Sequence, residues 1–141
     1  MKEQVIEIII SELDFYLIEK VREYRIKAKP YISQTALSIA LGVSEGFVSK
    51  VENPKERAKY NIRHLNRLLK IFKLTSFSGI LPASPVKNDI VRIRLQLKNM
   101  KKGKQAPDDS KPYKIISMKP LKEEEIQKWN KNELPYLTII K

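Results

Sequence analysis

Two short helical patterns joined by a tight turn constrain the fold of this chain more than any other feature. Ser33 is a favourable N-cap for a first helix that runs through Ala40, and Gly42 provides the left-handed conformation that ends it. Ser44 is a favourable N-cap for a second helix, which ends before Pro54. Two short helices that meet at a sharp turn predict a helix-turn-helix motif. Apolar side chains fix the inward faces of these helices at Leu37, Leu41, Val48 and Val51.

Further helices are expected on both sides of this motif. Residues 12 to 27 carry apolar side chains at helical spacing, and Pro30 prevents the helix from continuing. A fourth helix is expected from about residue 61 to residue 74, followed by a short helical turn at residues 77 to 81. Pro82 and Pro85 then mark the end of this unit, in which every expected element is a helix.

The hydrophobic pattern changes after Pro85. Apolar and polar side chains alternate from Val91 to Leu97, which predicts a half-buried strand. Two more strands are expected at residues 113 to 118 and 136 to 140. A short helix at residues 121 to 132 is expected between them, so this part of the chain mixes the two kinds of structure.

These patterns predict a mainly α fold, in which a five-helix domain is followed by a small α+β segment. The helical domain is assigned to residues 1 to 85, and residues 1 to 11 are an N-terminal extension whose β-branched run fits either a strand or a helix. The α+β segment is assigned to residues 86 to 141. Residues 99 to 112, which contain Gly, Pro, Asp and several lysines, predict a loop.

Composition narrows the classes of function. The chain has 28 Lys and Arg against 16 Asp and Glu, a net charge of +12 that favours a polyanionic partner. It contains no cysteine, so disulfides and thiolate metal sites are excluded and a reducing cytoplasm is expected. No signal peptide or membrane-spanning stretch is predicted. Without a nucleophile with its base, a phosphate-binding loop or a metal-ligand cluster, we expect no enzyme, no cofactor and no metal.

The segment from Ser33 to Asn53, SQTALSIALGVSEGFVSKVEN, resembles the DNA-binding domains of the lambda-repressor-like family, which includes the Cro and XRE proteins. The run Gly-Val-Ser followed by Val-Ser-Lys-Val-Glu-Asn is especially similar, and the likeness covers about residues 12 to 81. The resemblance implies the five-helix domain of that family and double-stranded DNA as the ligand. It implies nothing for residues 86 to 141.

The resemblance also implies which residues contact DNA. Gln34 corresponds to the residue that begins the bracing helix and touches phosphate or a base, and Lys50 is the best candidate for reading a base edge, because a lysine can donate to guanine O6 and N7. The other residues expected at base edges are Glu45 and Gly46, those near the sugar-phosphate backbone are Ser44, Phe47, Ser49 and Asn53, and those that clamp phosphate are Lys55, Arg57, Lys59 and Tyr60.

Three positions in or near the motif have individual explanations, two of them structural. Glu52 corresponds to a family position that pairs with an arginine on the first helix, so we expect it to pair with Arg25, or else with Lys27. Ser38 stands where the family has a small alanine, and we expect its hydroxyl to bond back to its own helix. Gly46 weakens a helix, which suggests that the DNA backbone approaches closely there.

Two functions are expected from these features. The first is a sequence-specific regulator of transcription, a repressor that binds as a homodimer to two half-sites about one helical turn apart. The second is an antitoxin or adaptor that binds a partner protein through residues 86 to 141, where an unpaired edge of the alternating strand from Val91 to Leu97 could accept a partner strand, with DNA binding secondary.

Overall fold

A computed structural model of the chain describes residues 4–98 and 112–141. It divides into two compact units, a helical unit of residues 13–86 and a sheet unit of residues 1–12 with residues 87–141. The loop predicted at residues 99 to 112 lies outside the described residues, apart from Pro112.

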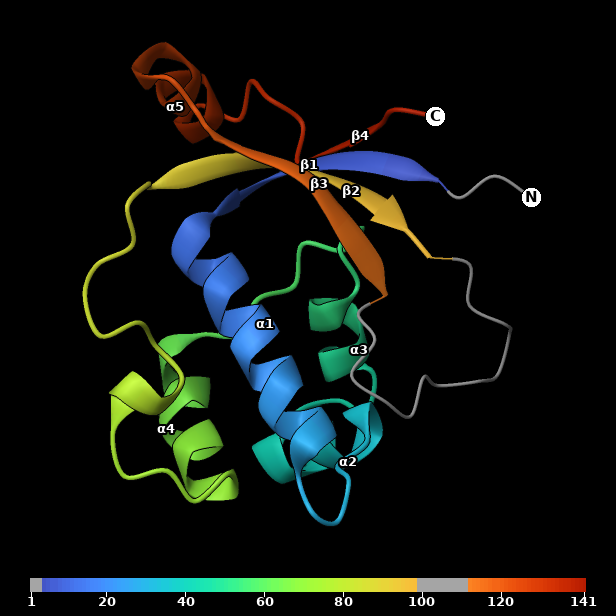
Figure 1. The fold of residues 1–141 in the computed structure, drawn as a ribbon, viewed down its shortest axis with the longest axis vertical. Helices are drawn as coiled ribbons and strands as arrows, with labels where there is room; N and C mark the ends of the chain where they lie inside the picture. Colours follow the sequence, from blue (N-terminus) through green and yellow to red (C-terminus); the bar gives the residue numbers. More distant parts are fainter. Residues whose placement is uncertain (1–3, 99–111) are drawn as a thin grey trace. The chain divides into compact units, whose positions relative to one another are not determined.

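The helical unit contains four α-helices and one short 3₁₀ helix. They are α1 (Glu12–Lys27), α2 (Gln34–Leu41), α3 (Phe47–Glu52), α4 (Ile62–Ile71) and the 3₁₀ helix η1 (Phe77–Gly79). Figure 1 shows α1 running between α4 on one side and α2 with α3 on the other. The five helical segments expected for this region are therefore all present.

The core of the helical unit consists of aliphatic side chains contributed by each of its segments. The fully buried members are Val21, Leu37, Val48, Leu68 and Ile80. The rings of Tyr24 and Phe72 stack with their centroids 5.4 Å apart, and the Tyr24 hydroxyl donates to the carbonyl of Gly79 at 2.7 Å. These contacts fix the end of α4 and η1 on α1, and the helices of the turn motif, α2 and α3, pack on each other and lie beside the same helix in Figure 1.

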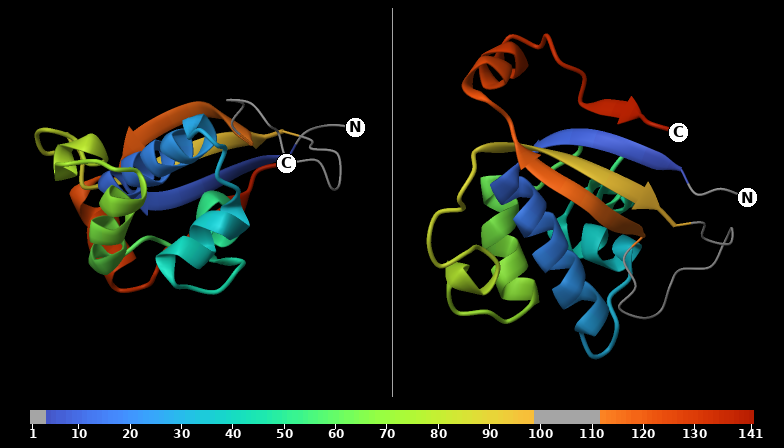
Figure 2. Two further views of the ribbon diagram at one scale, coloured as in Figure 1. Left: turned by 90° about the horizontal axis from the view of Figure 1, so that it is seen from below. Right: turned by 45° about the horizontal axis from the view of Figure 1, so that its top comes forward.

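The sheet unit contains four antiparallel strands and one helix. They are β1 (Val5–Ser11), β2 (Ile90–Leu97), β3 (Tyr113–Pro120), α5 (Glu123–Asn130) and β4 (Leu137–Ile139). The order across the sheet is β3-β2-β1-β4, so β3 and β4 are the edge strands, as Figure 2 shows. The register places Ile8 opposite Ile93, and a β-bulge interrupts the pairing of β2 with β3 at Arg94 and Leu95.

Alternation along β1 and β2 separates the two faces of the sheet. One face carries buried Ile6, Ile8, Val91, Ile93 and Leu95. On the opposite face, Ile9 and Ile90 form a small cluster with Leu121, against which Ile126 and Trp129 of α5 pack. Trp129 and Ile126 thus belong to a local core.

The expected mainly α fold is wrong, because the chain is an α+β mixture with a four-stranded antiparallel sheet. The N-terminal run, which fits either a strand or a helix by itself, forms β1 in the interior of the sheet and pairs with β2 from Val5 to Ser11. Its partner residues are 79 to 91 positions away in the sequence, so local periodicity cannot reveal the pairing. Residues 1 to 11 belong with the sheet unit rather than with the helical domain.

No helix in the described ranges is long and apolar enough to cross a lipid bilayer.

Candidate nucleic-acid interface

The two helices of the turn motif are held together by Ser38. Its side chain is fully buried, donates to the carbonyl of Gln34 at 2.9 Å and accepts the backbone N–H of Val48 at 3.0 Å. The first bond confirms that the hydroxyl bonds back to its own helix. The second satisfies a backbone donor in the first turn of α3, a position that has no partner within the helix itself. One small side chain therefore fixes the start of α3 on α2.

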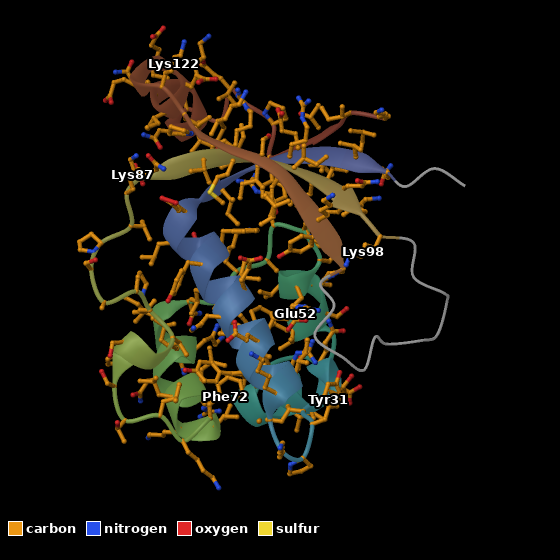
Figure 3. The ribbon with its side chains drawn as sticks, in the orientation of Figure 1. Tyr31, Glu52, Phe72, Lys87, Lys98 and Lys122 are labelled. Atoms are coloured by element: carbon orange, nitrogen blue, oxygen red, sulfur yellow. The ribbon has the colours of Figure 1, made fainter. Side chains whose placement is uncertain are left out.

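A buried ion pair fixes the other end of α3. Glu52 accepts two hydrogen bonds from Arg25 of α1, at 2.7 and 2.8 Å, and both side chains are at most 4% exposed. Figure 3 labels Glu52, which lies at the end of α3 on the side turned toward α1. This confirms Arg25, rather than Lys27, as its partner. Burial lowers the pKa of Arg25, but the hydrogen bonds and charge of Glu52 outweigh it and hold the pKa above its ordinary value.

Gln34 is tied to this pair. Its side-chain amide donates to Glu52 at 2.9 Å, so one end of the Gln34 side chain is engaged inside the protein. The side chain is half-buried, and its position at the first residue of α2 is the one expected from the sequence. The bond gives Gln34 a positioning role, because it orients the side chain at the start of the bracing helix.

The turn between the helices follows the expected chemistry. Gly42 has φ of +75°, a left-handed conformation that costs glycine little, and its N–H bonds to the carbonyl of Ile39. The Arg67 guanidinium donates to the carbonyl of Leu41 at 3.2 Å, where the negative end of the α2 dipole favours a cation. A Cβ at position 42 would lie 2.8 Å from the same guanidinium, so glycine also leaves room for Arg67.

The start of α3 differs from the expectation. Ser44 was predicted as its N-cap, but its carbonyl accepts the N–H of Phe47 in a tight turn and α3 begins two residues later, with Gly46 as N-cap. This shift arises because the turn from Ser44 to Phe47 replaces the first turn of the predicted helix. Within the described residues, nothing lies within 4 Å of a Cβ placed on Gly46.

The outer side of the turn and of α3 is open to solvent. Five of the expected contact residues that carry a side chain lie there in exposed positions, and within the described ranges Asn53 is the one whose side chain makes a hydrogen bond. Asn53 accepts the N–H of Lys55 at 3.0 Å and so closes the turn after α3. The exposed residues of this surface are Ser44, Glu45, Ser49, Lys50 and Asn53.

The loop after α3 separates the expected phosphate-binding residues into two groups. Lys55 and Arg57 are exposed, as a phosphate contact requires. Lys59 is half-buried, and its ammonium donates to the carbonyl of Arg57 at 3.0 Å. Burial lowers the pKa of Lys59, an effect that the charge of Asp14 partly opposes and that the charge of Arg57 increases. Lys59 is therefore turned back onto the protein.

Two expected DNA contacts belong instead to an aromatic cluster. The ring of Phe47 meets Tyr60 and His64, with centroids 6.0 and 5.1 Å apart. Tyr60 is only 5% exposed and its hydroxyl, with no hydrogen-bond partner among the described residues, is buried, which corrects its assignment as a phosphate clamp. Burial, with the negative charge of Glu52, raises the pKa of Tyr60, so it stays neutral. An aromatic residue after a basic run gives no signal of this inward orientation.

His64 has a role that its sequence context did not suggest. Its Nδ1 accepts the N–H of Asn61 at 3.0 Å, and the Asn61 side chain accepts the N–H of His64 at 3.0 Å, so the two residues cap α4 reciprocally. Burial, followed by the charge of Arg63, lowers the pKa of His64. The neutral imidazole is thus the form that caps the helix.

The surroundings of this surface are cationic. Residues 13–86 contain thirteen Lys and Arg against six Asp and Glu, and one of those glutamates is already paired with Arg25. In the described ranges, no group of three or more His, Cys, Asp or Glu is placed to hold a metal ion. The chemistry available at the surface is recognition of an anion and hydrogen bonding to a polar partner.

Comparison with known proteins adds no relative. No family model, no curated protein and no solved structure matches this chain.

Proposed function

We propose that the helical unit binds double-stranded DNA by placing α3 in the major groove, and that the chain regulates transcription as a homodimeric, sequence-specific repressor. The observation that carries this proposal is the contrast between the two sides of α3. Val48, Val51 and Glu52 are buried, whereas Ser49 and Lys50 are exposed. A recognition helix requires this combination, because base readout needs a fixed helix and free side chains.

The fixed position of α3 supports the proposal. Ser38 holds its first turn and the Arg25–Glu52 pair holds its last, so both ends of a six-residue helix are fastened to α1 and α2. A helix of this length gains little stability by itself. Side chains on its outer surface therefore start from a defined position when they meet a ligand.

Gly46 is a second support. Its φ of −90° is open to any residue, and within the described part of the protein a Cβ there would touch nothing. The fold thus leaves room for a larger side chain, although glycine is among the residues favoured at an N-cap. Close approach of a DNA backbone to the exposed start of α3 gives glycine a further role there.

Selection of bound duplexes from a random library tests the base-reading role of Lys50. We expect Lys50→Ala to relax one position in each half-site, because a good contact from a lysine to guanine contributes about 1–3 kcal/mol of discrimination. Lys20→Ala is the matched control, because it removes the same positive charge from a different helix. Lys20 lies on α1 beside the Tyr24 ring. The native protein should select a palindrome, with half-sites spaced about one helical turn apart. Equal recovery of all duplexes would contradict the proposal.

Gly46→Ala separates DNA binding from folding. We expect the free energy of unfolding to change by no more than about 1 kcal/mol, because the added methyl group meets open space. The affinity for the selected duplex should fall, since the same methyl group would lie between α3 and the DNA backbone. Fluorescence anisotropy with labelled duplex and thermal unfolding measure the two effects. Unchanged affinity would remove Gly46 from the interface.

Salt dependence tests the phosphate contacts. For native protein, log K should fall linearly with log salt, and Lys55→Ala and Arg57→Ala should each reduce the slope by about 0.9. The half-buried Lys59 provides the comparison, because Lys59→Ala should leave the slope nearly unchanged. A slope that falls equally for all three variants would show that the loop opens when DNA binds.

The strand expected to offer an open edge, from Val91 to Leu97, lies inside the sheet as part of β2 and is paired on both sides, so that expectation is wrong. The edge strand β3 instead favours a second candidate function, that of an adaptor for a partner protein. Ile115, Ile116 and Met118 are 36%, 49% and 38% exposed, and among the described residues β3 pairs with β2 on one side only. An open edge with apolar side chains can accept a partner strand. Purification from the native host should then yield a stoichiometric protein partner that Ile116→Lys releases. Recovery of the chain alone would leave DNA binding as the function.

A further inference from the structure

A groove beside the turn motif shares Gly42 and Arg67 with the turn described above but is lined by none of the residues expected to contact DNA. It has a volume of about 590 Å³ and lies between the turn after α2, the length of α4 and η1. Val43 lines it from the turn, Arg63, Arg67 and Lys70 from α4, and Phe77 from η1. A volume of this size is typical of sites for small molecules.

Among the residues that the structure describes, none supplies a counter-charge to the cationic side of the groove. Arg63, Arg67 and Lys70 follow α4 at intervals of four and three residues, which places them on one face of the helix. No Asp or Glu is among the described residues that line the groove. Arg67 is anchored by its bond to the Leu41 carbonyl, whereas Arg63 and Lys70 make no ion pair within the described ranges. Three converging cations without an acidic neighbour favour a bound anion.

The groove also has an apolar side. Ile62 is 83% exposed and Phe77 is 49% exposed, and both line the groove together with Val43. Exposed large apolar side chains beside a cluster of cations fit a ligand that combines a negative group with an apolar ring. A bare inorganic anion would leave these side chains in water.

We propose that this groove binds a small phosphorylated organic molecule of the nucleoside monophosphate class. The phosphoryl group is held by Arg63, Arg67 and Lys70, and the ring of the ligand packs on Ile62 and Phe77. Such a ligand would act as an effector, because Arg67 and Val43 connect the groove to the turn that joins α2 to α3. The proposed ligand site does not rest on the proposed DNA-binding function, because protein residues alone form it.

Isothermal titration calorimetry of the full chain with AMP, and separately with inorganic phosphate at equal ionic strength, tests the site. We expect AMP to bind at one saturable site about tenfold or more tightly than phosphate, because only AMP covers the apolar side. Phe77→Ser should reduce AMP affinity toward that of phosphate. AMP binding no tighter than phosphate would overturn the proposal.

The variant Arg63→Met/Lys70→Met tests the cations. AMP affinity should fall about tenfold or more, because two charge-assisted contacts are lost. Lys20→Met is the matched control and should bind AMP normally. Both replaced side chains are exposed, so folding is expected to be unchanged, and circular dichroism checks this. AMP affinity equal to that of the native protein would place the ligand elsewhere and overturn the proposal.

Duplex DNA distinguishes the two sources of phosphate. If the double variant binds duplex normally but loses AMP, the groove is a small-molecule site. If it loses duplex binding and the native protein does not bind AMP, the groove contacts the DNA backbone and our proposal is wrong. Because AMP binding is measured without DNA, a chain that binds AMP but no duplex would overturn the proposed function alone.

Discussion

The helical unit and the sheet unit hold their charges in different ways. In the helical unit, Arg25 and Glu52 form one pair whose side chains are 4% and 3% exposed. In the sheet unit, Glu7 lies between Arg92 and Arg94, and these three side chains are 20%, 32% and 43% exposed. The N···O distances are 2.7 and 2.8 Å in the first pair and 3.0 to 3.4 Å in the second group.

Burial, rather than distance, makes the two arrangements different in energy. Removing one partner of a buried pair leaves a charge that water cannot solvate, whereas a half-exposed charge is solvated when its partner is lost. The pair in the helical unit therefore fixes the position of α3. The network on the sheet surface contributes little to stability, and its loss should be tolerated.

Glu52→Ala should have the largest effect. We expect the helical unit to lose about 3–5 kcal/mol of unfolding free energy, because Arg25 is left buried and unpaired. Chemical denaturation followed by circular dichroism measures this loss, and the fluorescence of Trp129, the one tryptophan, reports separately on the sheet unit. The double variant Arg25→Met/Glu52→Met should be more stable than Glu52→Ala. A loss of unfolding free energy below about 1 kcal/mol would show that the buried pair contributes no more to stability than the half-exposed Glu7 network.

Ser38→Ala should have the next largest effect. The change leaves the buried N–H of Val48 without its acceptor, which should cost about 1–3 kcal/mol. Ser49→Ala is the matched control on the exposed side of α3 and should change stability by no more than about 0.5 kcal/mol. Equal effects of the two variants would show that Ser38 does not hold α3 on α2.

Glu7→Gln should have a smaller effect. The variant removes the charge that pairs with Arg92 and Arg94, and we expect a loss of about 1 kcal/mol or less because all three side chains remain hydrated. Added salt should reduce the difference between variant and native protein. A loss comparable to that of Glu52→Ala would remove the contrast between the two units.

The smallest effect is a pH dependence of the helical unit. The pKa of folded His64 lies below its ordinary value of 6.5, so the unfolded chain binds a proton first as pH falls. His64 thus favours the folded state fully above 6.5, and this contribution declines as pH falls from 6.5 to the lower folded pKa. The protonated ring also cannot accept the Asn61 N–H. Thermal unfolding against pH should show this decline, and His64→Gln should reduce it; an identical profile would contradict this role.

The turn motif could be predicted from sequence because its determinants are local. Gly42, the capping residue Ser33 and the apolar positions Leu37 and Val48 lie within about twenty residues, and each acts on its nearest neighbours. The pairing of Arg25 with Glu52 is different, because it is expected from the resemblance to the lambda-repressor-like family, with Lys27 as the alternative, and not from local pattern. Even in the turn motif the structure moved the start of α3 by two residues, since a tight turn at Ser44 replaced the expected helical cap.

The sequence by itself determined the helices, the turn and the alternation of β2, because periodicity and capping act over a few residues. Only the tertiary structure decided that Val5–Ser11 is an inner strand, that Tyr60 and Lys59 turn inward, and that cations on α4 converge on a groove. These outcomes depend on contacts between segments far apart in the chain. The local sequence pattern around a side chain is the same whether a distant segment of the chain buries that side chain or leaves it exposed to water.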